Sequence, residues 1–422
     1  MNYKLHKNGS YNIHTIKTDK FKTIRMEIIF RNNFNSETTS SRTALFELLT
    51  ENSKNYKTKR ALNLKEEELY NAVIYSESIK LGNQIISSIN LEFLNPKFTK
   101  DEYLEEALSL PFDLIFNPNI KGEEFDADTL EVVKKRLISE LSNIQEDPKK
   151  KAIVNALEFM DPKSISSKNI VGTKKQIEDV TPTQVYKEYI HSLNHDYIDI
   201  FIIGDFEENI VIDLINKYAH FKTIKNHKLD LFVNNKSHPK MRKKTDKSAD
   251  AQSQIIYIYN TVSLNEHERK YIMQIYNMIL GGGALETKLA QNLRNKNSLC
   301  YGVQSIYNKY DNLLIITTSV DKDNIEKAKK LIQSSVNEMK KEVTEEELTH
   351  AITSSISSVN MAFDYQNRII ANYLFNYMAE LDPMDIRISK YKEVTLKDVK
   401  NLSKKIKLNT IYVLEGDFNE EN

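Results

Sequence analysis

Residues 178–209 read EDVTPTQVYKEYIHSLNHDYIDIFIIGDFEEN, and the same succession of patterns returns at the end of the chain. The second copy, KEVTLKDVKNLSKKIKLNTIYVLEGDFNEEN, covers residues 392–422. Each copy has a Val-Thr pair, an amphipathic helical pattern, an apolar strand pattern and a Gly-Asp-Phe turn. Threonine suits the N-cap of a helix, so Thr181 and Thr395 mark two equivalent helix starts. The two copies therefore predict one structural unit that occurs twice.

The repeat extends upstream of these endings. An Asp-Pro pair follows a long helical pattern in each half, at Asp161-Pro162 and at Asp382-Pro383. A run rich in β-branched and aromatic residues near the start of each half predicts an early strand. Such runs, together with one further strand pattern in each half, cover residues 24–30, 83–93, 253–259 and 312–320. Strands cluster ahead of helices in both halves, which favours an antiparallel-rich sheet over a doubly wound parallel one.

We therefore expect an α+β fold that is a tandem duplication of an antiparallel-rich β-sheet with helices packed on one face. The predicted domains are residues 1–222 and 253–422, and residues 223–252 form a polar linker with an edge strand. The linker contains the basic run MRKKTDK at 241–247, which we interpret as a solvated segment rather than a binding patch.

Composition restricts the class of protein. The 422 residues are 40% hydrophobic and 28% charged with zero net charge, which predicts a soluble globular chain without nucleic acid as partner. No run approaches the ~18 apolar residues of a membrane-spanning helix, so we expect no membrane insertion. Cys300 is the single cysteine, in an apolar stretch, and we interpret it as a buried side chain. An N-terminus without an apolar signal-peptide core and the lack of any disulfide partner predict a cytoplasmic protein.

Residues 280–301 read LGGGALETKLAQNLRNKNSLCY and hold three of the ten glycines. The glycines end one helical pattern and precede a second, at 285–297, so a sharp corner between helices is one interpretation. A phosphate-binding loop is a weaker one, because the preceding strand and the Lys-Ser/Thr pair of such loops are missing.

The glycines are followed by spaced leucines, Arg294 and Tyr301. This pattern resembles the C-terminal-domain signature of the pitrilysin/insulinase-like zinc peptidases, which include mitochondrial processing peptidase. With the duplication, the resemblance extends over nearly the whole chain. It implies a processing-peptidase-like fold in which two homologous domains form a half-shell. It also implies that Arg294 and Tyr301 bind substrate and stabilise its developing oxyanion, next to a substrate loop of Gly281, Gly282 and Gly283.

Active members of this family carry an inverted zinc motif, H-x-x-E-H, on the first helix of the N-terminal half. The matching residues here keep Glu47 but have Ala44 and Leu48 in place of the two histidines. In a later helix Val133 takes the position of the third ligand, with Glu140 as the second glutamate; Glu131, two residues from Val133, stays open as an alternative. Aliphatic side chains cannot coordinate a metal, so we expect no zinc in this chain.

The nine histidines offer one further pair with ligand spacing, His191 and His195 in YIHSLNHDY. No acidic residue lies between them, and the second histidine is at a predicted helix exit. We therefore do not assign zinc to this pair.

The resemblance favours a zinc-free subunit of a heterodimeric metalloendopeptidase, inactive alone, whose partner carries the zinc and whose substrate is a short or unfolded peptide. In such a complex Arg294 and Tyr301 would act in trans. The alternative is a non-enzymatic peptide-binding or scaffold protein of the same fold, as in some respiratory-complex core subunits. A phosphate-binding enzyme that uses the three glycines is a third hypothesis.

Overall fold

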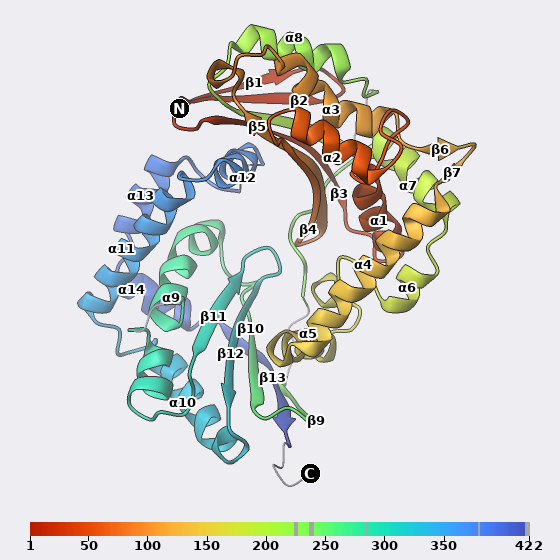
Figure 1. Cartoon of the computed structure of the whole chain (residues 1–422). Helices are drawn as coiled ribbons and strands as arrows, with labels where there is room; N and C mark the ends of the chain where they lie inside the picture. Colours follow the sequence, from red (N-terminus) through yellow and green to blue (C-terminus); the bar gives the residue numbers. More distant parts are fainter. Residues whose placement is uncertain (223–226, 236–239, 284–285, 379, 418–422) are drawn as a thin grey trace. The chain divides into compact units, whose positions relative to one another are not determined.

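In the computed structural model, the chain forms two compact units, each built around one β-sheet (Figure 1). All residues are described except 223–226, 236–239, 284–285, 379 and 418–422. Unit 1 comprises Met1–Ser142 and Asn169–Leu231, and unit 2 comprises Asn143–Lys168 and Phe232–Asn422.

The sheet of unit 1 has six strands in the order β1-β2-β8-β3-β5-β4. Only the neighbours β2 and β8 run parallel, and the other pairs are antiparallel. The strands are β1 (Asn2–Lys7), β2 (Asn12–Lys17), β3 (Thr23–Asn33), β4 (Val73–Leu81), β5 (Gln84–Leu94) and β8 (Tyr197–Gly204). A short hairpin pairs β6 (Ile120–Lys121) with β7 (Glu124–Phe125).

Helices bury one face of this sheet. Alternate residues of β3, from Ile24 to Phe30, belong to the same core as apolar side chains from the helices, as expected for a sheet covered on one face. The helices are α1 (Thr39–Leu49), α2 (Lys59–Glu68), α3 (Leu104–Phe116), α4 (Ala127–Glu146), α6 (Lys174–Glu178), α7 (Pro182–His195) and α8 (Glu208–Tyr218), with a 3₁₀ turn η1 (Pro96–Phe98).

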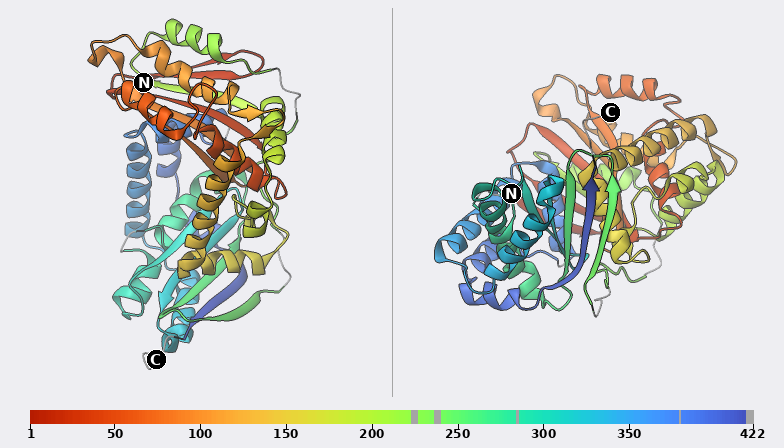
Figure 2. Two further views of the ribbon diagram at one scale, coloured as in Figure 1. Left: turned by 45° about the vertical axis from the view of Figure 1, so that its right-hand side comes forward. Right: turned by 90° about the horizontal axis from the view of Figure 1, so that it is seen from below.

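The sheet of unit 2 has five strands in the order β11-β12-β10-β13-β9. The last strand of the chain, drawn in blue, lies between two green strands (Figure 2). The strands are β9 (Arg242–Ser248), β10 (Ser253–Asn260), β11 (Val303–Asn308), β12 (Leu313–Val320) and β13 (Lys407–Gly416). The helices are α5 (Pro148–Met160), α9 (Met273–Leu280), α10 (Ile325–Glu338), α11 (Glu345–Ala362), α12 (Gln366–Tyr377), α13 (Met384–Lys392) and α14 (Leu396–Ser403), with the π-helices η3 (Glu268–Ile272) and η4 (Ala290–Asn295) and the 3₁₀ turns η2 (Ile165–Ser167) and η5 (Lys322–Asn324).

The two sheets share one topology, which confirms the predicted duplication. The order β2-β8-β3-β5-β4 of unit 1 corresponds to β9-β13-β10-β12-β11 of unit 2, and in both the first two strands are the parallel pair. The threonine caps are also equivalent: Thr181 accepts from the amide of Gln184, and Thr395 from that of Asp398, each within a capping box. Of the second Gly-Asp-Phe turn, Phe418 lies outside the described residues.

The domain limits differ from the expectation because α5 packs on the second sheet. Its Ala152, Ala156 and Met160 share a core with Ile256 and Tyr412, on the face of that sheet opposite to α9 and α10 (Figure 1). A helix expected within residues 1–222 therefore belongs to unit 2, and the boundary between the units falls inside α4.

The expected linker also contains regular structure. Most of the basic run lies in β9, residues 242–248, which pairs with β13 and is the edge strand expected in this segment, and none of its residues is fully buried. The second boundary between the units falls in this segment, between Leu231 of unit 1 and Phe232 of unit 2. Residues 223–226 and 236–239 of this segment lie outside the described residues.

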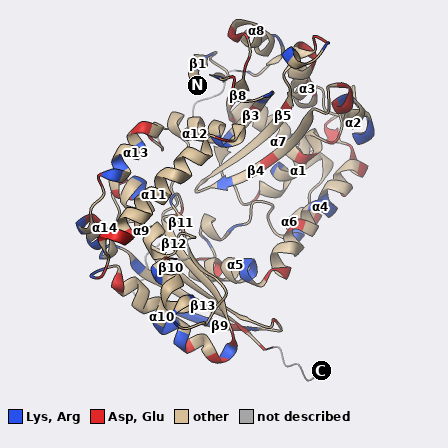
Figure 3. Ribbon diagram, turned by 60° about the vertical axis from the view of Figure 1, so that its left-hand side comes forward, with Lys and Arg blue, Asp and Glu red and all other residues tan. Residues whose placement is uncertain are grey.

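Charged residues are distributed over both units. Basic and acidic positions alternate along the helices (Figure 3), in keeping with the zero net charge. Within the described ranges, no helix combines the length and the apolar character that a bilayer crossing requires.

Candidate functional site

The positions that correspond to the zinc motif lie on α1, and they are part of the core. Ala44 is fully buried and Leu48 is 3% exposed, and both belong to the hydrophobic cluster that joins α1 to the first sheet. Neither side chain has an atom that can coordinate a metal. Packing in the core therefore accounts for both side chains.

Glu47, the retained glutamate, is held by an arginine from α4. The Arg136 guanidinium donates from Nε to Glu47 Oε2 at 2.7 Å and from a terminal nitrogen to Glu51 Oε1 at 2.9 Å. Burial raises the pKa of the Glu47 carboxyl, and the charge of Arg136 opposes that rise. A carboxylate engaged in this way is a structural partner of α4, not a free base for water.

The third zinc-ligand position, whether it is Val133 or Glu131, also shows no sign of a metal site. Val133 is fully buried in the core of unit 1, whereas Glu131 is largely exposed and pairs with Lys134 at 2.8 Å. Glu140 lies close enough to Glu47 to act on it electrostatically. Among the residues that the structure describes, no three His, Cys, Asp or Glu side chains are grouped as a metal site requires. The residues present therefore do not fit the zinc ion that the fold family implies.

His191 and His195 lie together near the end of α7, with ring centroids 4.7 Å apart. Burial lowers the pKa of the His191 imidazole. The pair belongs to no group of three potential ligands within the described part of the chain.

The structure explains why each of the three positions after α9 is a glycine, and the explanation differs between them. A side chain on Gly281 would come within 2.8 Å of the backbone nitrogen of Ser305, and one on Gly282 within 2.8 Å of the Met278 Cα. Gly283 has φ +104°, in the left-handed region that favours glycine, and a Cβ at this position would meet no atom of the described residues within 4 Å. Close packing requires the first two glycines, and backbone conformation requires the third.

The helix after the glycines begins later than expected and is wound differently. The sequence pattern predicts a helix over 285–297, but the helix starts at residue 288, and residues 290–295 form the π-helix η4. The Lys296 amide donates to the Gln291 carbonyl at 3.0 Å, five residues back. Short π-helical segments frequently occur at functional sites. Residue 285 lies outside the described residues.

Arg294 and Tyr301 lie side by side at the end of this segment. The guanidinium carbon is 5.3 Å from the centre of the Tyr301 ring, a cation–π contact. Leu299 and Cys300, directly before the tyrosine, are buried, whereas Tyr301 is 90% exposed. Burial also raises the pKa of the Cys300 thiol, so this cysteine is not an activated nucleophile. The structure thus brings the two predicted donors together and leaves the tyrosine outside the core.

A cavity of about 470 Å³ adjoins the pair. Arg294, Tyr301 and Gly283 line it, and so do Lys149 from α5 and Thr317 from β12. Gly281 and Gly282 do not line it. Sequence reasoning did not include Lys149 or Thr317, because they come from segments far from the glycine stretch in the chain.

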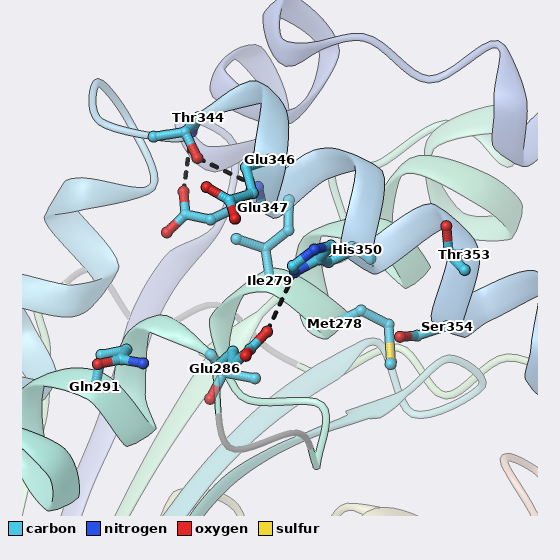
Figure 4. Close-up of a pocket in the computed structure, with 12 residues that line it drawn as sticks. Met278, Ile279, Glu286, Gln291, Thr344, Glu346, Glu347, His350, Thr353 and Ser354 are labelled. Carbon is cyan, nitrogen blue, oxygen red and sulfur yellow. Dashed lines mark hydrogen bonds and ion pairs between the residues drawn. The ribbon is translucent and has the colours of Figure 1, made fainter.

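A second cavity has a volume of about 660 Å³, and Figure 4 shows the residues that line it. It is lined by Met278 and Ile279 of α9, by Gln291 of η4 and by residues from the start of α11. His350 Nδ1 is 3.2 Å from Glu286 Oε2 across it. Glu346 and Glu347 also line it, so its charged groups are mostly acidic.

Sequence reasoning also missed a buried charge cluster in unit 1. The Arg42 guanidinium of α1 donates to Asp196 Oδ2 at 2.6 Å and to Glu188 Oε1 at 3.3 Å, and all three side chains are buried. Burial, opposed by Arg42, raises the pKa of the Glu188 carboxyl to about 7. A lone arginine in the apolar helix pattern SSRTALFELL is the one signal that could have indicated this cluster.

Comparison with known proteins gives relatives that include inactive-type M16 peptidases. Residues 179–355 match the family described as "Peptidase M16 inactive domain". Over 423 aligned residues the chain is 25% identical to the "Probable inactive metalloprotease YmfF" of Bacillus subtilis (strain 168), with 97% of each protein covered.

Two solved structures have the same fold over essentially their whole length. A conserved protein from Enterococcus faecalis V583 matches with a TM-score of 0.92 and 26% identity, over 100% of both chains. A peptidase M16 inactive domain from Pseudomonas fluorescens matches with a TM-score of 0.78 and 17% identity, over 100% of this chain and 99% of that one.

The duplicated sheet, the apolar residues at the zinc positions and these matches agree with one another. The chain is therefore similar over its whole length to an inactive-type relative of the pitrilysin/insulinase-like (M16) peptidases, and residues 179–355 match the inactive domain of that family.

Proposed function

We propose that this chain is the zinc-free subunit of a heteromeric insulinase-like metalloendopeptidase. It supplies Arg294 and Tyr301 to a reaction centre whose zinc ion and glutamate base belong to a partner subunit. The substrate is a short or unfolded peptide. The chain alone does not cut peptide bonds, because nothing on α1 or α4 activates water.

The exposure of Tyr301 carries this proposal. A tyrosine that is 90% exposed contributes little to the core, and yet it is held beside Arg294 at the mouth of a cavity. A phenol and a guanidinium are hydrogen-bond donors suited to a peptide carbonyl and to the oxyanion that forms on it. Such donors need no metal of their own to be useful, provided that another chain supplies one.

Strand β4 supports the peptide part of the proposal. It is an edge strand of the first sheet, in which exposed residues alternate with buried or half-buried ones over most of its length. Val73, Tyr75 and Ile79 are large apolar residues on its exposed face. An extended peptide can add to such an edge through backbone hydrogen bonds. We assign β4 as the docking strand, and the loop with Gly283 as a wall of the site next to Arg294.

The proposal places the complex in the cytoplasm. The only cysteine is buried in the core of unit 2, so the fold uses no disulfide and needs no oxidising compartment.

The test is reconstitution with a family member that carries an intact H-x-x-E-H motif. Each purified subunit is assayed alone and in the mixture, on a mixed peptide digest, and the zinc content of both is measured. We expect zinc only in the partner and cleavage chiefly in the mixture. Arg294→Ala in this chain should lower the rate of the mixture by roughly 10²–10³-fold, as for loss of an oxyanion donor.

Arg368→Ala is the matched control, since Arg368 also stacks on an exposed tyrosine, Tyr365, but does not line the cavity. This variant should cleave like the unaltered mixture. Full activity of the partner alone, or of the mixture with Arg294→Ala, would contradict the proposal. The second of these results, with an intact complex, would favour the non-enzymatic scaffold.

A further inference from the structure

The cavity beside η4 is lined by two cations and by no acidic side chain. Arg294 enters it from η4 and Lys149 from the first turn of α5. Within the described residues, neither side chain forms an ion pair, although the protein has as many acidic as basic residues. The acidic second cavity shows that this local excess of positive charge is not general. The cavity therefore attracts anions.

The position of Lys149 strengthens that positive field. The start of a helix carries a partial positive charge, so lysine is disfavoured there and acidic residues are preferred. The first turn of α5 has no acidic residue, and only the cap residue Asp147 compensates, by accepting from the amides of Lys149 and Lys150. Lys150 also lies near the Asp147 carboxylate, at 3.7 Å, which leaves Lys149 as the cation of this turn that faces the cavity.

Thr317 adds a polar group that lacks a protein partner. Its side chain is 1% exposed, and its hydroxyl has no hydrogen bond to any described residue. On β12 it shares a face with Ile315, which packs in the same core as α5, so the hydroxyl lies on the Lys149 side of the strand. A buried hydroxyl without a partner costs free energy, and a bound ligand would satisfy it.

We propose that this cavity is a carboxylate-binding subsite, which selects peptides that bring either a C-terminal α-carboxylate or an Asp or Glu side chain. The inference rests on the proposed function, because it names the kind of peptide that the site takes. The planar fork of Arg294, oriented by the Tyr301 ring, suits the two oxygens of a carboxylate. Lys149 adds a second charge, and the Thr317 hydroxyl donates to the anion.

The experiment measures binding of labelled peptides to the full chain alone by fluorescence anisotropy. One neutral sequence is made with a free C-terminus and with an amidated one, and two further amidated versions carry one internal glutamate or one phosphoserine. We expect at least one carboxylate peptide to bind about tenfold more tightly than the neutral amide, and this preference to weaken as salt is raised. The two carboxylate peptides distinguish an α-carboxylate from a side chain as the group recognised.

Substitutions in and near the cavity test whether it is the place where the carboxylate binds. Lys149→Ala and Arg294→Ala should each abolish the preference for a carboxylate, whereas Lys150→Ala, the same change one residue away on the exposed side of α5, should retain it. Thr317→Val keeps the shape of the side chain but removes the hydroxyl. This variant should bind the carboxylate peptide several-fold more weakly, and the thermal stability of the protein should not fall.

Equal binding of the acid and amide peptides would overturn the inference, and so would equal losses in Lys149→Ala and Lys150→Ala. Tighter binding of the phosphoserine peptide than of both carboxylate peptides would also overturn it. These results would leave the proposed function in place, because reconstituted cleavage tests that function separately. Conversely, a carboxylate preference in a chain that supports no cleavage would retain the subsite and remove the metalloendopeptidase role.

Discussion

The resemblance assigns site residues to two regions, the α1–α4 region of unit 1 and the η4 cavity of unit 2. The side chains of these two regions differ in what they contact. At α1 all three residues matched to the zinc motif are explained by folding: Ala44 and Leu48 fill the core, and Arg136 neutralises Glu47. At η4 the opposite holds, since Tyr301 is exposed and Arg294 has no acidic partner among the described residues. The difference teaches that packing accounts for the side chains at α1, whereas the η4 cavity keeps an exposed tyrosine and an arginine that packing does not explain.

The largest expected effect comes from putting histidines back on α1. Ala44→His with Leu48→His places two large polar rings in a closed core, and we expect the free energy of unfolding to fall by about 3–5 kcal/mol. The double variant should bind no zinc, because Val133 and the Arg136–Glu47 pair stay in place. Urea unfolding and metal analysis of the purified protein measure the two outcomes. A stable variant that holds one zinc ion per chain would show that α1 is a dormant metal site instead.

An intermediate effect should come from Glu188, whose folded pKa of about 7 lies above its ordinary 4.5. The fold favours the protonated carboxyl, so this contribution to stability is complete below about pH 4.5 and is lost as the pH rises through about 7. Relative to Glu188→Gln, the unaltered protein should lose on the order of 2 kcal/mol between pH 5 and pH 8. Urea midpoints of both proteins across this range test the sign. Parallel pH curves would mean that Glu188 is ionised throughout and that Arg42 fully compensates it.

The smallest effect should come from Glu47→Gln. The resemblance aligns this glutamate with the base of active family members, but it pairs with Arg136, which is 43% exposed, and such pairs contribute about 1 kcal/mol or less. Stability should change by no more than that, and cleavage by the reconstituted mixture should change less than twofold. Compared with Arg294→Ala in the same assay, this variant sharpens the contrast between the two regions. A loss of cleavage similar to that of Arg294→Ala would show that α1 still takes part in the reaction.

The duplication could be predicted from the sequence because its signals are local. Thr181 and Thr395 start capping boxes, and the strand that follows each helix is a continuous apolar run between turn residues. The absence of histidines at 44 and 48 could likewise be stated from the residues alone. Periodicity does not show which sheet a helix covers, and for that reason the sequence places α5 in the first domain although it packs in unit 2.

The contents of the site were only partly predictable. The spacing of a family signature identified Arg294 and Tyr301, but Lys149 and Thr317 reach the same cavity from α5 and β12, and that proximity exists only in the folded chain. The late start and the π-helical winding of 290–295 could not be predicted, because helix propensity does not separate a π-helix from an α-helix.

The position of α5 determines how the chain can be divided for biochemical work. A fragment cut at the visible sequence repeat, from about residue 223 onward, would lack this helix and would expose Ile256, Ile258 and Tyr412 to water. Such an apolar strip along a sheet invites aggregation during expression. A fragment of the second half would therefore need residues 143–168 supplied in trans, as a separate peptide that complements it.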